Sequence, residues 1–102
     1  MIVDDEEFCI TTLKSMLFNL GIDTECQVDF CINGLEALET LVSAYRSNQS
    51  YKVIFTDFCM PVMSGIESTT KIRSFLGEEL NIPRSEQPMI IGVTGHILNK
   101  NE

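Results

Sequence analysis

Four short apolar runs occur along the chain, and each is bounded by polar or turn-forming residues. They are rich in β-branched and aromatic residues, which favour strands, and they cover residues 1–3, 26–32, 52–56 and 89–93. The third run (KVIFT) stops at Asp57 and is apolar over most of its length. It therefore predicts a central strand that is buried on both faces.

Between these runs, apolar residues recur every three or four positions, which predicts helices with one core-facing side. The core-facing sides are expected to consist of Ile10, Leu13, Leu17 and Leu20 in a first helix and of Leu35, Leu38, Leu41, Val42 and Tyr45 in a second. Gly21 is expected to end the first helix, and the Asn33-Gly34 turn precedes the second. A third helix is expected over about residues 66–76, followed by a polar surface loop at 77–88 that holds two prolines.

Strands and helices thus alternate in the order βαβαβαβ. This order predicts an α/β fold, with a parallel sheet, helices on both faces and right-handed crossovers. In open sheets of this kind, the functional crevice lies beyond the carboxyl ends of the strands. The residues that directly follow the strands are therefore the first candidates for a functional site.

Three carboxylates and one hydroxyl follow the predicted strands. Asp4 and Asp5 come after the first strand, Asp57 after the third and Thr94 after the fourth. Two carboxylates about 4 Å apart repel by roughly 4 kcal/mol at an effective dielectric of about 20. A cluster of three therefore requires a cation, a raised pKa or both, and Mg²⁺ is the natural oxygen-preferring ion.

Each of these residues also has a plainer interpretation. Asp4 and Asp5 fit an acidic helix start, where the helix dipole favours negative charge. Asp57 alone fits a loop acid or a helix cap, and Thr94 alone fits a β-branched strand residue. The functional interpretation rests on their joint placement after three different strands.

Composition narrows the choice of function. The chain has 102 residues, of which 44% are hydrophobic and 22% charged, which fits one globular domain. A net charge of −8 with only seven Lys and Arg argues against direct nucleic-acid binding. No run approaches the roughly 20 apolar residues of a spanning helix, and no signal peptide is apparent. We therefore expect no membrane contact by this domain and a cytoplasmic location, free or within a membrane-attached parent protein.

The four cysteines show no metal-binding or disulfide pattern. Cys9, Cys26, Cys31 and Cys59 are irregularly spaced without a C-x-x-C pair, and the single His96 is far from all of them in sequence. They are predicted to be free thiols that are buried or half-buried.

Four segments together resemble the signature segments of response-regulator receiver domains of the CheY type. They are IVDDE (2–6), NGLEAL (33–38), TDFCMPVMSG (56–65) and VTG (93–95), and the third is the most discriminating. The VTGH variant is similar to receivers of eukaryotic hybrid histidine kinases. The resemblance implies a flavodoxin-like three-layer sandwich with strand order 2-1-3-4. The family's fifth strand and last helix have no counterpart, so residues 1–102 are expected to be a single receiver domain that is incomplete at its C-terminus.

The resemblance also implies a role for each candidate residue. Asp57 is expected to be the phospho-acceptor that forms a 4-aspartylphosphate, and Thr94 to reach the bound phosphoryl group with its hydroxyl. Asp5 and Asp57 are expected to ligate Mg²⁺ directly, with Asp4 acting through water. The backbone carbonyl of Cys59 is expected to complete the metal site.

One feature of the family is missing. Receivers carry a Lys at the end of the fifth strand that neutralises the phosphoryl charge, and Lys100 lies in the wrong element to replace it. Two further hypotheses concern Cys59 and His96, which stand two residues after Asp57 and Thr94. Either side chain is expected to influence how long the phosphoryl group survives.

The resulting interpretation is a phosphorelay module rather than a turnover enzyme. Its phosphoryl donor is expected to be a phosphohistidine on a histidine kinase or a histidine phosphotransfer domain, and the chain is expected to catalyse its own phosphorylation. One alternative is a Mg²⁺-dependent phosphohydrolase that uses an aspartyl-phosphate, although such enzymes in the haloacid-dehalogenase group carry a second Asp where this chain has Cys59. The other alternative is a degenerate receiver that acts as an interaction scaffold, which the missing Lys makes plausible.

Overall fold

A parallel sheet forms the centre of the computed structural model, which describes residues 1–58, 60 and 62–93. Within these residues the sheet has four strands in the order β2-β1-β3-β4. Their bounds are Ile2–Val3 (β1), Phe30–Cys31 (β2), Val53–Thr56 (β3) and Met89–Gly92 (β4). Strand order and direction confirm the predicted α/β fold of flavodoxin-like type.

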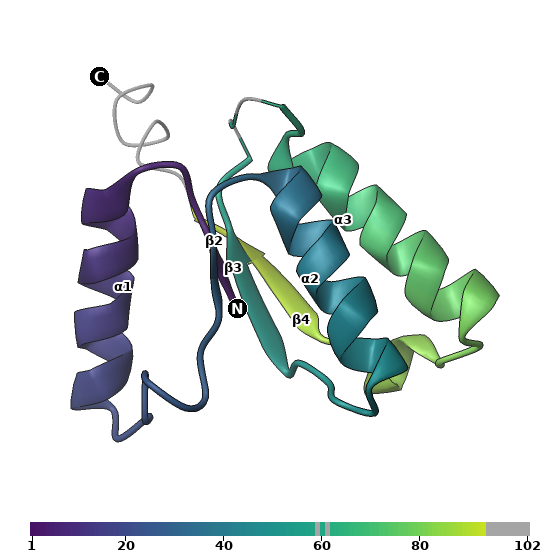
Figure 1. Cartoon of the computed structure of the whole chain (residues 1–102), viewed down its shortest axis with the longest axis horizontal. Helices are drawn as coiled ribbons and strands as arrows, with labels where there is room; N and C mark the ends of the chain where they lie inside the picture. The colour runs from purple at the N-terminus through teal and green to yellow at the C-terminus, as the bar shows by residue number, and fades with distance from the viewer. Residues whose placement is uncertain (59, 61, 94–102) are drawn as a thin grey trace.

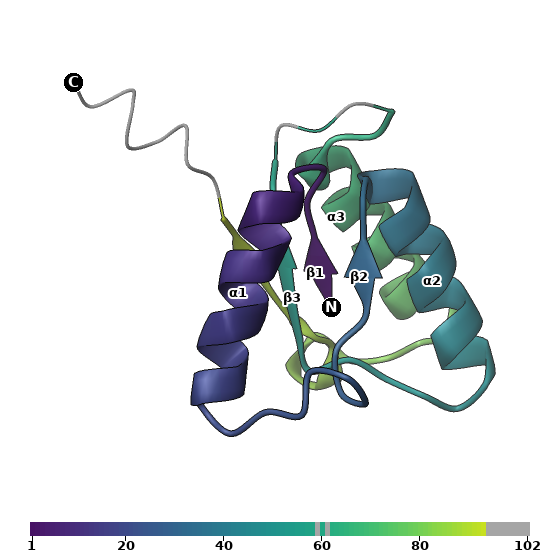
Figure 2. The ribbon, with the colours of Figure 1, turned by 60° about the vertical axis from the view of Figure 1, so that its left-hand side comes forward.

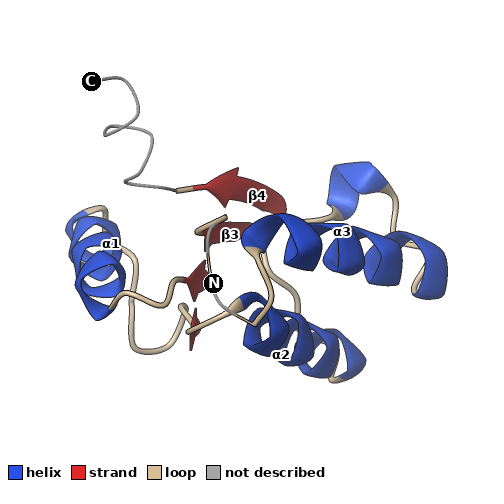
Figure 3. Ribbon diagram, turned by 90° about the horizontal axis from the view of Figure 1, so that it is seen from above, coloured by secondary structure: helices blue, strands red, loops and turns tan. Residues whose placement is uncertain are grey.

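Helices cover both faces of the sheet. Their bounds are Glu7–Asn19 (α1), Gly34–Arg46 (α2) and Gly65–Ser74 (α3). Helix α1 lies on one face, and α2 and α3 lie side by side on the other (Figures 1 and 3). In the described part of the chain, no helix is long and apolar enough to cross a membrane.

The register of β1 brings together the ends of strands that are distant in sequence. Ile2 pairs with Phe30 on one side and with Phe55 on the other. The same pairing continues past the strand ends, because Asp57 donates its backbone N–H to the Val3 carbonyl at 3.0 Å. The β1–α1 and β3–α3 connections therefore begin next to each other at the carboxyl ends of the two central strands (Figures 1 and 2).

The core lies mainly between the sheet and the α2–α3 layer. Its largest fully buried aliphatic side chains are Val3, Leu41, Ile54 and Leu76. By contrast, none of the residues of α1 is fully buried. The predicted core side of α1 is confirmed only in part, because Ile10, Leu13 and Leu17 are half-buried and Leu20 is 77% exposed.

The exposure of Leu20 has a local cause. The helix ends at Asn19, Leu20 is its C-cap, and Gly21 turns the chain with a φ of 91°. Helical periodicity therefore no longer applies at Leu20. Leu35 is likewise 38% exposed, because it stands in the first turn of α2 at the edge of the layer.

The second strand is shorter than the predicted 26–32. The residues before β2 form a turn instead, because the Asp23 side chain accepts hydrogen bonds from the N–H groups of Glu25 and Cys26. Gln27 closes the same turn by donating its N–H to the Asp23 carbonyl at 2.8 Å. These local bonds compete with strand pairing, and only Phe30–Cys31 joins the sheet.

The third helix departs from α-geometry near its end. It begins at Gly65 and continues beyond Ser74 as a π-helical turn at Phe75–Glu79. The polar segment predicted as a loop therefore starts later than residue 77, and it also holds a short 3₁₀ turn at Arg84–Glu86.

The free cysteines differ more in burial than predicted. Cys31 is buried and Cys9 is half-buried, as expected, but Cys26 is exposed because it lies in the turn before β2. Burial raises the pKa of the Cys31 thiol to about 11. Cys59 lies outside the described residues.

Candidate functional site

The carboxylates of Asp4, Asp5 and Asp57 lie together at the carboxyl ends of β1 and β3. One oxygen from each side chain lies within 4.8 Å of the other two. Asp4 and Asp57 are buried, with 4% and 8% of their surface exposed, whereas Asp5 faces solvent. We call these three residues the acid cluster.

Local hydrogen bonds set the position of Asp4. Its backbone N–H donates to the Cys31 carbonyl at 3.0 Å, which extends the β1–β2 pairing by one residue. Its carboxylate accepts from the backbone N–H of Glu6 at 2.9 Å. This short turn connects β1 to the start of α1 and leaves the adjacent Asp5 facing solvent.

The environment of Asp4 is unfavourable for a negative charge. Burial raises the pKa of its carboxyl group, and the charges of Asp57 and Asp5 raise it further. The hydrogen bonds from the Glu6 N–H and the Cys9 thiol act in the opposite direction. Burial, with a smaller contribution from the two neighbouring carboxylates, therefore outweighs these hydrogen bonds and favours the neutral form of Asp4.

Cys9 is a neighbour of the cluster that sequence reasoning did not assign. Burial raises the pKa of its thiol, and the nearby charges of Asp4, Glu6 and Asp57 add to the effect. The thiol is thereby kept in its neutral, hydrogen-bond-donating form. The sequence feature that could have identified Cys9 is its place in the first turn of α1, five residues after Asp4.

The donor set of the acid cluster fits a hard divalent cation. All three side chains offer carboxylate oxygens, and two of them are buried while the third is open to water. Mg²⁺ prefers oxygen ligands, uses few carboxylates and retains several waters, which an open-sided cluster allows. Asp4, Asp5 and Asp57 are therefore the described residues that could hold it.

The two ends of the β3–α3 loop, at Asp57–Phe58 and at Gly65, lie close together. Gly65 donates its N–H to the Phe58 carbonyl at 3.3 Å, and a Cβ on Gly65 would lie 2.9 Å from the Asp57 carbonyl carbon. Ser64 caps α3 by accepting from the Glu67 N–H at 3.1 Å. The loop can therefore return to the strand end only with glycine at residue 65.

Val62 lies in the same loop with an unusual backbone. Its φ is 69°, in the left-handed region that β-branched residues rarely adopt, and its side chain is 76% exposed. Such strain is typical of loops whose shape serves a site.

Two of the predicted site residues, Cys59 and Thr94, lie outside the described residues, as do His96 and Lys100. The structure thus brings together three of the five predicted site residues. Their chemical roles stay predictions.

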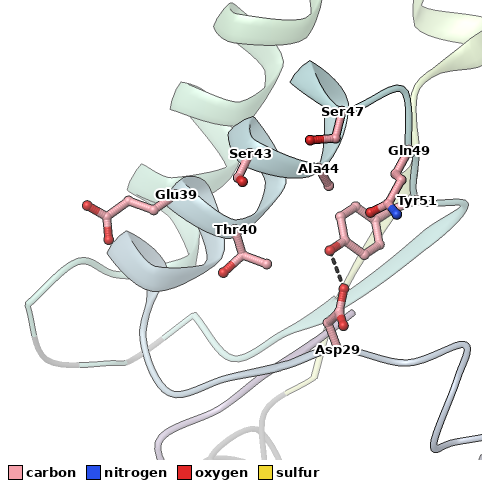
Figure 4. A pocket seen from close by; sticks show the side chains of 8 residues that line it. All are labelled: Asp29, Glu39, Thr40, Ser43, Ala44, Ser47, Gln49 and Tyr51. Carbon is pink, nitrogen blue, oxygen red and sulfur yellow. Dashed lines mark hydrogen bonds between the residues drawn. The ribbon is translucent and has the colours of Figure 1, made fainter.

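A polar groove lies at the opposite end of the strands and is separate from the acid cluster (Figure 4). Asp29, which precedes β2, and Tyr51, which precedes β3, lie on one side of it. The C-terminal half of α2 forms the other side, and the Tyr51 hydroxyl donates a hydrogen bond to the Asp29 carboxylate.

Comparison with known proteins agrees with this geometry. The family model of the response regulator receiver domain matches residues 1–100. Hybrid signal transduction histidine kinase G of Dictyostelium discoideum is 31% identical over 99 residues, which is 97% of this chain and 2% of that protein. Hybrid signal transduction histidine kinase L of the same organism is 31% identical over 102 residues, which is 100% of this chain and 5% of that protein.

A smaller relative is also similar. A chemotaxis protein CheY homolog of Campylobacter jejuni is 32% identical over 74 residues, covering 72% of this chain and 52% of that protein. The chain therefore spans only a small part of the hybrid kinases and about half of the CheY homolog.

Proposed function

Because the chain belongs to the response regulator receiver domain family, we propose that it accepts a phosphoryl group from a phosphohistidine onto Asp57 in the presence of Mg²⁺. Membership of the family places the chain in two-component phosphorelay signalling. The observation that carries the finer proposal is the acid cluster, in which two carboxylates are buried beside a third despite their mutual repulsion.

The proposed step is a direct phosphoryl transfer. A carboxylate oxygen of Asp57 attacks the phosphorus of the phosphohistidine, forming a P–O bond as the P–N bond breaks. The imidazole leaves with the electron pair of that bond and takes up a proton. Phosphoryl transfer depends mainly on positioning and charge neutralisation, and Mg²⁺ supplies the positive charge when it is bound.

The remaining site residues have supporting roles in the proposal. When Mg²⁺ is bound, Asp5 would ligate it directly and Asp4 would act through water, with the carbonyl of Cys59 completing the protein's share. Thr94 binds a phosphoryl oxygen with its hydroxyl. The buried position of Asp4 and the exposed position of Asp5 are compatible with this division.

The proposed donors are a histidine kinase or a histidine phosphotransfer domain. The relatives named as hybrid histidine kinases support this partner class. A module of this kind transmits a signal by adding charge that shifts a loop equilibrium, without turning over a substrate. We place this function in the cytoplasm, with neither nucleic acid nor membrane as a direct partner of the domain.

Intact-mass measurement with acetyl phosphate and Mg²⁺ tests the proposal. We expect one added phosphoryl group on the wild-type chain and none on Asp57→Asn, which keeps the size of the side chain and removes the nucleophile. Chelation of Mg²⁺ should abolish the adduct. An adduct that persists in Asp57→Asn would refute the assignment.

The same assay separates the alternatives. Repeated turnover of small phosphoesters would indicate a phosphohydrolase. Mg²⁺ binding without any adduct would indicate an interaction scaffold.

A further inference from the structure

Three segments meet around Gly34, the first residue of α2. Its backbone N–H donates to the Met63 carbonyl in the β3–α3 loop at 3.1 Å. Its own carbonyl accepts a hydrogen bond from the Ser68 hydroxyl of α3 at 2.9 Å. We call Gly34, Met63 and Ser68 the Gly34 junction.

The junction is tightly packed. A Cβ on Gly34 would lie 2.5 Å from the Met63 carbonyl oxygen and 2.9 Å from the Cβ of Ser68. All three residues are buried, and Met63 is 8% exposed. Met63 of the loop therefore contacts the backbone of α2 directly, with no side chain between them.

Ser68 has an unusual role for a helical serine. Its own backbone N–H is used within α3, where it donates to the Ser64 carbonyl. Its hydroxyl instead crosses to another helix and reaches a residue 34 positions away. A single neutral hydrogen bond contributes only about 1 kcal/mol to stability, but this one is buried and fixes the direction of approach of α2.

The junction contacts the same loop that carries Asp57. One end of the loop begins at Asp57, whose N–H is bound to Val3, and the other end is held through Met63. Gly65, two residues after Met63, donates its N–H to the Phe58 carbonyl, which directly follows Asp57. The loop thus has two anchors, the strand end and the Gly34 junction.

We propose that Ser68 is a positioning residue for the acid cluster, acting through Gly34 and Met63 to hold the β3–α3 loop in the shape that keeps Asp57 beside Asp4 and Asp5. Its effect on the phosphorylation rate rests on the proposed function, whereas its effect on Mg²⁺ affinity does not. A failure of this inference can therefore be distinguished from a failure of the proposed function.

Ser68→Ala tests the inference, with Tyr45→Phe as the matched control. Each variant loses one hydroxyl that is hydrogen-bonded to backbone, but Tyr45 bonds to Tyr51 at the amino end of the sheet. We measure the Mg²⁺ dissociation constant by calorimetry, and the rate of adduct formation as a function of acetyl phosphate concentration.

We expect Ser68→Ala to weaken Mg²⁺ binding about tenfold, the low end of the range for groups that orient metal ligands, because Ser68 acts on the acid cluster only through Gly34 and Met63. At saturating Mg²⁺, its maximal rate should fall about tenfold with an unchanged half-saturating acetyl phosphate concentration. Tyr45→Phe should change neither quantity. A general loss of stability would affect both variants alike.

A folded Ser68→Ala with the Mg²⁺ affinity and maximal rate of the control would overturn the inference. If Ser68→Ala fails to fold, Ser68→Cys preserves the size of the side chain with a weaker donor, and the same criteria apply. A wild type that binds Mg²⁺ but gains no phosphoryl group would refute the proposed function, and the Mg²⁺ affinities would then decide the inference alone. A wild type that binds no Mg²⁺ would refute both.

Discussion

The two ends of the sheet both carry carboxylates, but in opposite surroundings. At the amino end, Asp29 accepts a hydrogen bond from Tyr51, whose backbone N–H in turn donates to the Tyr45 hydroxyl at 3.3 Å. At the carboxyl end, Asp4 and Asp57 are buried next to Asp5. The first arrangement pairs one carboxylate with a hydroxyl donor, whereas the second concentrates three carboxylates.

This difference separates structure from function. A carboxylate that is paired with a hydroxyl adds to the stability of the fold. A cluster of carboxylates lowers the stability of the metal-free protein, and like charges held together in this way are more typical of functional sites than of structural ones. The amino end therefore stabilises the fold, and the carboxyl end carries the proposed function.

The largest expected effect comes from Gly65→Ala at the carboxyl end. The added Cβ would collide with the backbone of Asp57 and Phe58, so the loop cannot close and Asp57 is displaced. We expect the rate of phosphoryl uptake to fall by about 100-fold, as misplacement by about 1 Å commonly causes. Adduct formation followed by intact mass measures it.

Gly77→Ala is the matched control for this change. Its Cβ would meet only the Gln87 side chain, at an ordinary distance of 3.6 Å. Uptake should stay at the wild-type rate. Equal losses in the two variants would show that the tight loop is irrelevant to the site.

Asp5→Asn should have the next largest effect. It removes one charge from the cluster, so we expect Mg²⁺ affinity to fall by about tenfold or more while the metal-free protein becomes more stable. Calorimetric titration and urea denaturation without metal measure the two quantities. Asp29→Asn should do the reverse, lowering stability without changing Mg²⁺ affinity, because it weakens the acceptor of Tyr51.

Tyr51→Phe should affect the amino end alone. It removes the donor to Asp29, which we expect to cost about 1 kcal/mol of unfolding free energy at this half-exposed position. Phosphoryl uptake by the folded variant should equal that of the wild type. A slower uptake would show that the two ends of the sheet are coupled.

The pH dependence of stability gives the smallest effect. Because the fold raises the pKa of Asp4 above its ordinary 3.8, the native state binds the proton more tightly than the unfolded state. The contribution of Asp4 to the stability of the metal-free protein is therefore fully present below pH 3.8 and is lost as the pH rises through the raised pKa. Urea denaturation at several pH values should show this decline in the wild type, but not in Asp4→Asn.

Sequence patterns predicted the parallel α/β sheet and the convergence of the acids, because both follow from the geometry of parallel βα units. The strand order was predicted only through the resemblance to receiver domains. Asp4 and Asp57 stand directly after strands, so pairing of the strands was enough to bring them together. The short β2 was not predicted, because its strand pattern is overridden by the side-chain turn at Asp23. The role of Ser68 could not be predicted, since its bond to Gly34 depends on how α2 packs against α3.

The double pairing of β1 also has a consequence for how the chain folds. Ile2 must pair with both Phe30 and Phe55, so the central pairings of the sheet join residues far apart in sequence. Contacts of such high sequence separation slow folding, because a long loop must close before they stabilise the structure. The acid cluster is assembled by the same closure, and its two buried members can meet only after it. We therefore expect a partly folded chain, even one with all its helices formed, to be unable to accept a phosphoryl group.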